Sequence, residues 1–358
     1  MLLFLGVDSH KDSLAACLVD QTGAQLTAAT FLNTPDGHGD LLAWVGRSGQ
    51  LTRAGIEGAA NLGAGMARFL HQQGLDVREV PCTLTVRERR RLRRPGKSDP
   101  TDALAIARIT AREHDLPPAR HAGQAEDLKV LSDYRDELVA QRTAEANRLH
   151  ADLAIVCAGY ARHCRALSSA HALNTATGLL EPAATTAGSG SVRAQLAQRR
   201  IVRLRQLDEQ IAACLTQLTK LVAVTRTQLV DIVGIGPLLA ARILGEVGDI
   251  QRFPTRDHFA SANGTAPIPV SSGRTDRHRL NRGGNRRLNR ALYFAALTQA
   301  SHDPRARAYL ARKQAEGKTR REALRCLKRR LSDVVYKALL AGPKPPEQAD
   351  ESPDTTAA

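Results

Sequence analysis

The chain has 358 residues with a formal net charge of +15, a hydrophobic share of 42% and an aromatic share of 3%. This length allows two or three domains with cores of their own, and the composition indicates a mostly helical protein rather than a β-sandwich. No apolar run approaches the roughly 20 residues that cross a bilayer, and the basic excess indicates a polyanionic partner.

The N-terminal region, residues 1–115, alternates strand and helix patterns. The predicted elements in chain order are strands at 2–7, 14–19 and 25–33, a helix at 37–46, a strand ending at Glu57, a helix at 61–73 and a strand at 77–80. Three consecutive strands followed by alternating helices and strands are typical of a mixed sheet covered by helices. The pattern predicts an α/β domain of the ribonuclease H-like type.

Residues 116–227 are predicted to form a helical arm. Two long helices, at 126–160 and 198–222, carry polar and apolar residues, and the second has apolar residues at steps of three or four that form a coiled-coil seam. The seam consists of Leu204, Leu207, Ile211, Leu215, Leu218 and Val222. The segment between the helices, 166–196, is rich in Ala, Thr, Ser and Gly, which predicts a flexible tip.

A basic, mostly helical domain is predicted over 228–342. Residues 251–340 hold 21 basic and 6 acidic side chains. Gly234 and Gly236 precede Pro237 and a helix, which resembles a helix-hairpin-helix whose glycines let backbone N–H groups approach a phosphate. An ordinary Gly-Pro turn between packed helices is the alternative. The last residues, 343–358, are predicted to be a disordered tail.

The cysteines and the N-terminus bear on the cellular compartment. Six cysteines lie far apart, and the one close pair, Cys157 and Cys164, has no second pair to complete a zinc site. We expect reduced thiols, with neither disulfides nor a structural metal, in a cytoplasmic protein. The N-terminus has no basic start, and Asp8 ends its apolar run too early for a signal peptide.

Four carboxylates are candidates for a metal site. Asp8 ends the first predicted strand and Glu57 ends a central strand, while Asp99 and Asp102 flank Pro100 at a helix start and share one helix face. Hard oxygen ligands at strand ends are what a magnesium pair needs to assist phosphoryl transfer. Each residue alone is more simply explained as a turn residue or a helix cap, but the four together favour the metal site.

Two arginine-rich segments are candidates for binding phosphate. The first runs directly into the last two carboxylates and contains Arg89, Arg90, Arg91, Arg93 and Arg94. It is predicted to be a phosphate clamp or, equally well, a solvated basic helix. The second follows Ser271 and Ser272 and contains Arg274, Arg277, Arg279, Arg282, Arg286 and Arg287.

Ser272 precedes Gly273 on a predicted loop within that second segment. A serine among guanidinium groups is suited to attack a phosphodiester, because the positive charges stabilise the charge that develops. From chemistry alone, however, an ordinary Ser-Ser-Gly loop is the more common explanation.

The order and spacing of these motifs resemble one family, the DEDD-type insertion-sequence transposases, over about residues 3–340. The better-studied members are bridge-RNA-guided serine recombinases. The segments that carry the resemblance are Gly6-Val7-Asp8-Ser9-His10-Lys11, Ile56-Glu57-Gly58, Lys97-Ser98-Asp99-Pro100-Thr101-Asp102-Ala103, Val233-Gly234-Ile235-Gly236, Ala262-Asn263-Gly264-Thr265-Ala266-Pro267, Ser272-Gly273 and Arg282-Gly283-Gly284-Asn285-Arg286-Arg287-Leu288. One departure is Gly-Thr-Ala-Pro at 264–267, where the family usually has Gly-Leu-Thr-Pro.

The resemblance implies a RuvC-like catalytic domain, a coiled-coil arm and a C-terminal transposase domain. The family's four acids fall on Asp8, Glu57, Asp99 and Asp102, and its serine nucleophile falls on Ser272. It further implies Mg²⁺, donor and target DNA, a noncoding bridge RNA, and homodimers that pair into a tetramer. One alternative is a Holliday-junction or RNA–DNA nuclease with water as nucleophile; another is a non-enzymatic binder, which leaves the four carboxylates unexplained.

Overall fold

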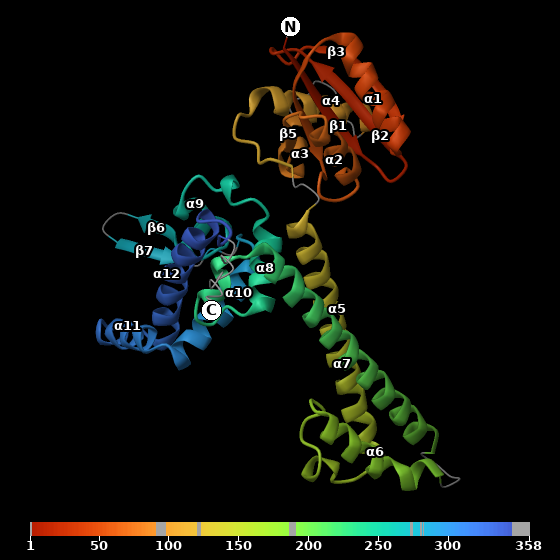
Figure 1. Cartoon of the computed structure of the whole chain (residues 1–358), viewed down its shortest axis with the longest axis vertical. Helices are drawn as coiled ribbons and strands as arrows, with labels where there is room; N and C mark the ends of the chain where they lie inside the picture. The colour runs from red at the N-terminus through yellow and green to blue at the C-terminus, as the bar shows by residue number, and fades with distance from the viewer. Residues whose placement is uncertain are drawn as a thin grey trace, which may run out of the picture. The chain divides into compact units, whose positions relative to one another are not determined.

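The computed structural model describes residues 2–90, 98–119, 123–185, 191–272, 275–279, 281 and 283–345. The chain divides into two compact units, whose elements are labelled in Figure 1. The first unit comprises Met1–Glu126 and Gly248–Pro254, and the second comprises Asp127–Val247 and Thr255–Ala358. No helix in the described part of the chain combines the length and the apolar character needed to span a membrane.

A five-stranded mixed sheet forms the centre of the first unit. Its strands are β1 (Leu3–Ser9), β2 (Ser13–Val19), β3 (Gln25–Leu32), β4 (Leu51–Glu57) and β5 (Val77–Glu79), in the spatial order β3-β2-β1-β4-β5. The first three strands pair antiparallel, whereas β1, β4 and β5 run parallel. The predicted α/β arrangement of this region is therefore confirmed.

Helices cover both faces of this sheet, because the central strands are apolar on both sides. They are α1 (Pro35–Ser48), α2 (Ala64–Gln72), α3 (Cys82–Arg89) and α4 (Asp99–Arg112). One face packs Leu5 and Val7 of β1 into a core that includes Leu41 of α1 and Leu70 of α2. On the opposite face, Phe4, Ala15, Cys17 and Val19 pack against Ala103 and Ala107 of α4.

Two neighbouring glycines let α4 lie directly on the sheet. Gly6 of β1 and Gly55 of β4 are partners in the parallel ladder. A Cβ at Gly6 would collide with backbone atoms of Ala103 and Ala107, and a Cβ at Gly55 would collide with the hydroxyl of Thr110. The absence of side chains here brings the backbone of α4 against β1 and β4. The same contact places the N-terminus of α4 near the end of β1.

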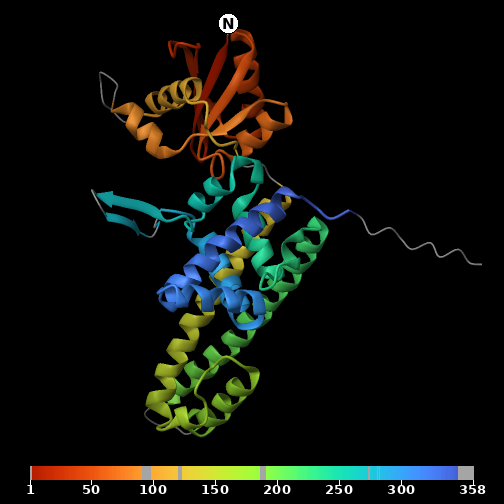
Figure 2. The ribbon, with the colours of Figure 1, turned by 90° about the vertical axis from the view of Figure 1, so that its left-hand side faces the viewer.

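The arm consists of two long helices and a packed helical end. Helices α5 (Gln124–Val156) and α7 (Ser191–Thr225) run side by side in Figures 1 and 2 and are joined by the Arg142–Asp208 and Arg200–Glu145 ion pairs. Between them lie the 3-10 turn η1 (Tyr160–Arg162) and helix α6 (Ala170–Thr185).

The predicted flexible tip at 166–196 is wrong for the residues that form α6. Leu173, Ala176 and Leu180 of this helix are almost fully buried and share a core with Leu149 of α5 and Ile201 of α7. An alanine-rich sequence is compatible with a linker, but alanine is also the best helix former and its small side chain lets helices approach closely. The low-complexity run at 186–190 lies outside the described residues.

The seam of α7 is largely covered within the chain. Leu204, Leu207, Leu218 and Val222 are buried, whereas Leu215 is 38% exposed. Leu207 packs with Leu138 of α5, which supplies part of the cover. Pairing of the two helices is thus established, and supercoiling of the pair stays a prediction.

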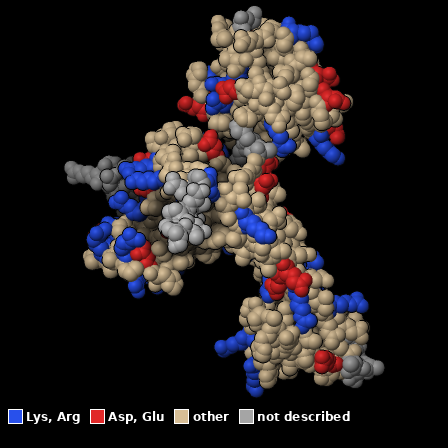
Figure 3. All heavy atoms as spheres, in the orientation of Figure 1, with Lys and Arg blue, Asp and Glu red and all other residues tan. Residues whose placement is uncertain are grey.

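The rest of the second unit is a helical domain with one β-hairpin. Its elements are η2 (Gln228–Asp231), α8 (Pro237–Val247), α9 (Arg256–Ala262), β6 (Ile268–Ser272), β7 (Thr275–Arg279), α10 (Arg286–His302), α11 (Pro304–Ala315) and α12 (Arg320–Leu340). The 3-10 turn η3 (Ile250–Arg252) lies between α8 and α9 in the sequence but belongs to the first unit. Figure 3 shows Lys and Arg gathered over α11 and α12.

Two sequence predictions for this region need correction. The predicted loop around Ser272 is instead the end of strand β6, which pairs with β7. Pro269 lies within β6, and an edge strand tolerates proline. The predicted disordered tail starts too early, because Pro343 bridges Thr227 and the Lys344 ammonium pairs with Asp231 at 2.7 Å. Residues 346–358 lie outside the described part of the chain.

Candidate active site

The carboxyl ends of β1 and β4 place two of the predicted acids side by side. Asp8 and Glu57 are direct partners in the parallel ladder. Side chains at the same register of adjacent parallel strands point to the same face. The side chain of Asp8 is 14% exposed, so it lies in a largely dehydrated position at the sheet edge.

The N-terminus of α4 adds the other two acids. Asp99 and Asp102 lie in its first turn, where the partial positive charge of the helix favours carboxylates. The residue at the N-cap is Ser98, so the explanation of Asp99 as a cap does not hold. Asp102 is buried and Asp99 is exposed.

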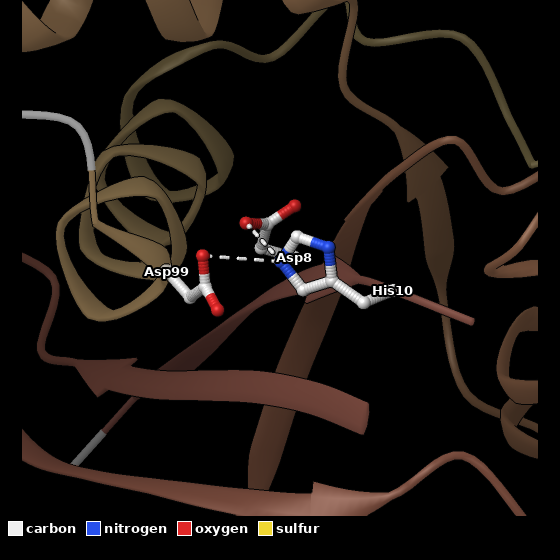
Figure 4. A group of neighbouring side chains, drawn as sticks. All are labelled: Asp8, His10 and Asp99. Carbon is white, nitrogen blue, oxygen red and sulfur yellow. Dashed lines mark ion pairs between the residues drawn. The ribbon is translucent and has the colours of Figure 1, made fainter. Parts of the chain in front are cut away.

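His10 joins this acidic group, although sequence reasoning did not assign it a role. Its Nε2 lies 3.3 Å from Asp8 Oδ2 and 3.2 Å from Asp99 Oδ1, as Figure 4 shows. One ligand atom from each of Asp8, His10 and Asp99 lies within 4.8 Å of the other two. The available signal was its position two residues after Asp8, which returns its side chain to the same side of the extended chain.

The clustering of acids changes the protonation of Asp8. Burial raises the pKa of Asp8 above its ordinary value of 3.8, the nearby His10 opposes that rise, and the negative charges of Asp102, Glu57 and Asp99 add to it. Asp102, Glu57 and Asp99 therefore lie close enough to Asp8 to influence its ionisation. Like charges held together in this way make a candidate binding site for a positive ion.

Arg89 contacts one of the acids directly. Its Nη1 lies 3.0 Å from Asp102 Oδ1 and donates to Asp102 Oδ2 at 3.1 Å. The predicted partner of Arg89 is phosphate, but in this structure its guanidinium pairs with a carboxylate of the candidate site. Arg90 is exposed, and the neighbouring Arg91, Arg93 and Arg94 lie outside the described residues.

The donor set fits a divalent cation. Carboxylate oxygens are the ligands that Mg²⁺ and Mn²⁺ prefer, and Asp8 and Asp99 supply them in the group that also contains His10. The imidazole of His10 would suit Mn²⁺ or Zn²⁺ better than Mg²⁺, because nitrogen is a softer ligand. The residues present thus support a metal site of acidic character, without selecting magnesium.

The predicted nucleophile and its neighbours lie in the second unit. The backbone of Ser272 ends β6 opposite Thr275 of β7. Arg277 and Arg279 belong to β7, and Arg279 is exposed. Arg274 and Arg282 lie outside the described residues.

At the start of α10, two neighbouring arginines differ in their surroundings. Arg286 is exposed, whereas Arg287 forms ion pairs with Asp133 and Glu246. A structural role therefore accounts for Arg287 as well as the predicted phosphate contact does.

The two predicted phosphate-binding glycines also differ. Gly234 has a φ of +86°, and a Cβ there would lie 2.7 Å from the Ala295 carbonyl of α10, so packing alone requires a glycine. Gly236 is surrounded by open space directly before α8. The element before this turn is the 3-10 turn η2, so the helix-hairpin-helix stays a prediction.

Two segments of the chain match family models of transposases. Residues 5–158 match the family profile of DEDD transposases of the IS110 type, described as a transposase. Residues 226–311 match the profile described as the transposase IS116/IS110/IS902 family.

Two of the curated relatives described here align along nearly the whole chain, and a third aligns with a shorter segment. The 42 kDa protein of insertion element IS900 from Mycobacterium paratuberculosis is 27% identical over 94% of this chain and 95% of its own length. The 44.8 kDa protein of insertion element IS116 from Streptomyces clavuligerus is 25% identical over 96% of this chain and 97% of its own length. The 43.6 kDa protein of IS110 from Streptomyces coelicolor is 42% identical, over 30% of this chain and 27% of its own length.

Among solved structures, RuvC from Thermus thermophilus in complex with a Holliday junction aligns with 30% of this chain and 91% of its own chain. The sequence identity is 14% and the TM-score is 0.25. A second Thermus thermophilus RuvC structure gives 16% identity and a TM-score of 0.24.

Proposed function

We propose that this chain, which belongs to the IS110 family of DEDD insertion-sequence transposases, is a DNA recombinase that cuts and rejoins strands through a phosphoserine intermediate. The observation that carries this proposal is the convergence of Asp8, Glu57, Asp99 and Asp102 at one sheet edge. Acids repel DNA unless a cation lies between, so a non-enzymatic binder has no use for such a cluster.

In this proposal the four carboxylates would hold Mg²⁺. When bound, such a cation would stabilise the negative charge that develops on phosphate and leaving oxygens. The sheet and α4 hold the acids in place before any ligand arrives, and His10 contacts both Asp8 and Asp99. Such preorganisation avoids the cost of assembling four like charges during the reaction.

Ser272 is assigned the attack on DNA. Its Oγ forms a bond to a backbone phosphorus while one bond from that phosphorus to a deoxyribose oxygen breaks. The serine proton passes to water, and the departing deoxyribose oxygen takes up a proton. Because the phosphoserine ester conserves the bond, attack by a deoxyribose hydroxyl can reverse the step and join a new strand.

The proposal also includes a noncoding bridge RNA and a dimer that pairs into a tetramer. The support is the family resemblance together with a charge of +15, which exceeds what a small DNA contact requires. RNA should co-purify with the full chain, and binding should weaken steeply with salt. Recombination that survives ribonuclease treatment unchanged would remove the RNA from the proposal.

The nucleophile is tested with a matched pair of serine variants. With labelled donor DNA and Mg²⁺, the wild-type protein and Ser271→Ala should form a covalent protein–DNA adduct on a denaturing gel. Ser272→Ala should form none, because it lacks the attacking oxygen. Strand cleavage by Ser272→Ala without an adduct would identify instead a nuclease that uses water, and an adduct in Ser272→Ala would place the nucleophile elsewhere.

A further inference from the structure

Helix α10 exposes two adjacent aromatic side chains in a chain that has few aromatics. The sequence contains 6 Phe, 5 Tyr and 1 Trp. Five of the six phenylalanines are buried or half-buried, whereas Phe294 is 41% exposed, as is Tyr293 beside it. The two ring centroids lie 5.9 Å apart with the planes inclined by 59°. The opposite face of α10 is buried, so packing of the fold does not require these rings.

Arginines extend the same helix face. Arg286, Arg290, Tyr293 and Phe294 occupy positions i, i+4, i+7 and i+8, which form one stripe about 12 Å long at 1.5 Å per residue. All four are exposed. The Arg290 guanidinium lies over the Phe294 ring, 5.4 Å from its centroid. We refer to these four residues as the α10 stripe.

The stripe carries positive charge that the described protein does not neutralise. Helix α10 contains no Asp or Glu. Arg286 and Arg290 form no ion pair with any acid among the described residues, whereas the neighbouring Arg287 pairs with Asp133 and Glu246. The partner of the stripe must therefore offer both negative charge and flat apolar surface.

We propose that the α10 stripe binds unpaired bases of a DNA strand. Bases stack on aromatic rings and on guanidinium planes, and backbone phosphates pair with arginine. Paired bases in a duplex are already stacked on one another and do not offer these faces, so the stripe selects an opened strand. A second copy of this chain fits less well, because two arginine-bearing stripes would repel.

The position of the stripe suits a cut strand. Arg286 is the first residue of α10. Two residues that precede it contact the end of α9: the Asn285 backbone N–H donates to the Ala262 carbonyl, and the Asn281 amide donates to the Ser261 carbonyl. This placement deepens the proposed function, since the strand would be held in the unit that carries Ser272.

Binding is measured by fluorescence anisotropy with a labelled oligo(dT) strand of 20 nucleotides and a duplex of equal length. All proteins carry Ser272→Ala and the buffer contains EDTA, so the result does not depend on the proposed chemistry. The double variant Tyr293→Ala, Phe294→Ala should weaken oligo(dT) binding about tenfold or more, because each lost base stack is substantial. Its affinity for the duplex should change less than twofold.

The control is Tyr134→Ala, which removes an exposed tyrosine from α5, where Asp133 and Asp136 are neighbours. It should leave both affinities unchanged. Phe294→Trp should retain oligo(dT) binding, and circular dichroism verifies the fold of each variant. Equal losses for strand and duplex, or none for either, would overturn the proposal. The proposal would also be overturned if the double variant lost affinity only for an oligo(U) RNA strand. The same holds if the double variant changed the sedimentation of the protein, and thus its self-association, without a change in oligo(dT) binding.

Discussion

At the ends of β1 and β4, Asp8 lies near three further carboxylates, whereas in the helical unit Glu246 lies among a lysine, an arginine and an asparagine amide. Glu246 accepts from Lys129 Nζ at 2.9 Å and from Asn285 Nδ2 at 2.6 Å. Asp133 accepts from the same lysine at 3.0 Å and from Arg287. We refer to Lys129, Asp133, Glu246, Asn285 and Arg287 as the helical network.

These surroundings shift the pKa values of Asp8 and Glu246 in opposite directions. Burial and the neighbouring acids raise the pKa of Asp8 despite His10. Burial by itself would also raise the pKa of Glu246, but hydrogen bonds from Asn285 and Lys129 and the charge of Lys129 lower it below its ordinary value. The charges of Glu246 and Asp133 in the helical network thus favour the fold, whereas the charge of Asp8 at the sheet edge opposes it.

The two regions therefore differ in what their acids do. The acids of the helical network stabilise the fold, whereas the fold must keep the acids at the sheet edge together. Groups whose interactions destabilise the free protein persist where binding or catalysis needs them. The acids at the sheet edge belong to this second class, and the packing of α4 on β1 and β4 keeps them together. Four measurements test this distinction.

Neutralising Asp8 should give the largest effect, a loss of activity without a loss of stability. Asp8→Asn should lower strand cleavage at least about 1000-fold, because a charged ligand of the proposed cation is lost. Its free energy of unfolding in EDTA should stay equal or rise by up to about 1 kcal/mol, because repulsion among the acids decreases. Cleavage assays and urea denaturation measure the two quantities, with Asp12→Asn, an exposed acid after β1, as control. Wild-type cleavage by Asp8→Asn would remove this acid from the site.

Gly6→Ala should separate α4 from the sheet. The added Cβ meets backbone atoms of Ala103 and Ala107, which cannot move aside as a flexible side chain can. We expect a loss of about 3 kcal/mol in the free energy of unfolding, at the upper end for overpacking. Gly39→Ala, on α1 with open space around its Cα, should cost no stability. Equal stability of Gly6→Ala and the wild type would contradict the role given to this packing.

Glu246→Gln should destabilise the helical unit. The substitution keeps a hydrogen-bond acceptor but removes the charge that Lys129 and Arg287 face, so we expect a loss of about 2 kcal/mol, less than for a fully buried pair. Urea denaturation measures it. Glu209→Gln, at an exposed position on α7, is the matched control and should be neutral. A neutral Glu246→Gln would mean that the network adds no net stability.

The smallest expected effect is the pH dependence of the stability that is lost in Glu246→Gln. The pKa values of Glu246 and Asp133 lie below their ordinary values of 4.5 and 3.8 in the folded protein. Their contribution is complete above the unfolded values and is lost as pH falls through the folded ones. The difference in free energy of unfolding between the wild type and Glu246→Gln should therefore be constant from pH 7 to about 5. It should decrease below about pH 4.5. A difference that increases in acid would reverse the assigned sign.

The sequence alone located the strands of the first unit and the acids at their ends. Apolar runs bounded by turn residues are local signals, so β1, β2, β3 and β4 were predicted nearly at their observed bounds. The order of strands then implied that Asp8 and Glu57 share an edge. The same local reasoning failed for β6, whose Pro269 is atypical of a strand, and for α6, whose small residues are also typical of a linker.

What the sequence determined by itself was the kind and order of the elements and the family motifs along them, because periodicity, turn residues and chemistry-bearing side chains are properties of neighbouring positions. Only the tertiary structure decided which groups meet. The contacts of His10 with Asp8 and Asp99, the pairing of Arg89 with Asp102, and the isolation of the α10 stripe all depend on chain segments that pack from afar. The deciding contacts are at Gly6, where the backbone of α4 lies against β1, and at Gly55, where the Thr110 side chain of α4 lies against β4. The missing side chains at these two positions let α4 bring its acids to β1.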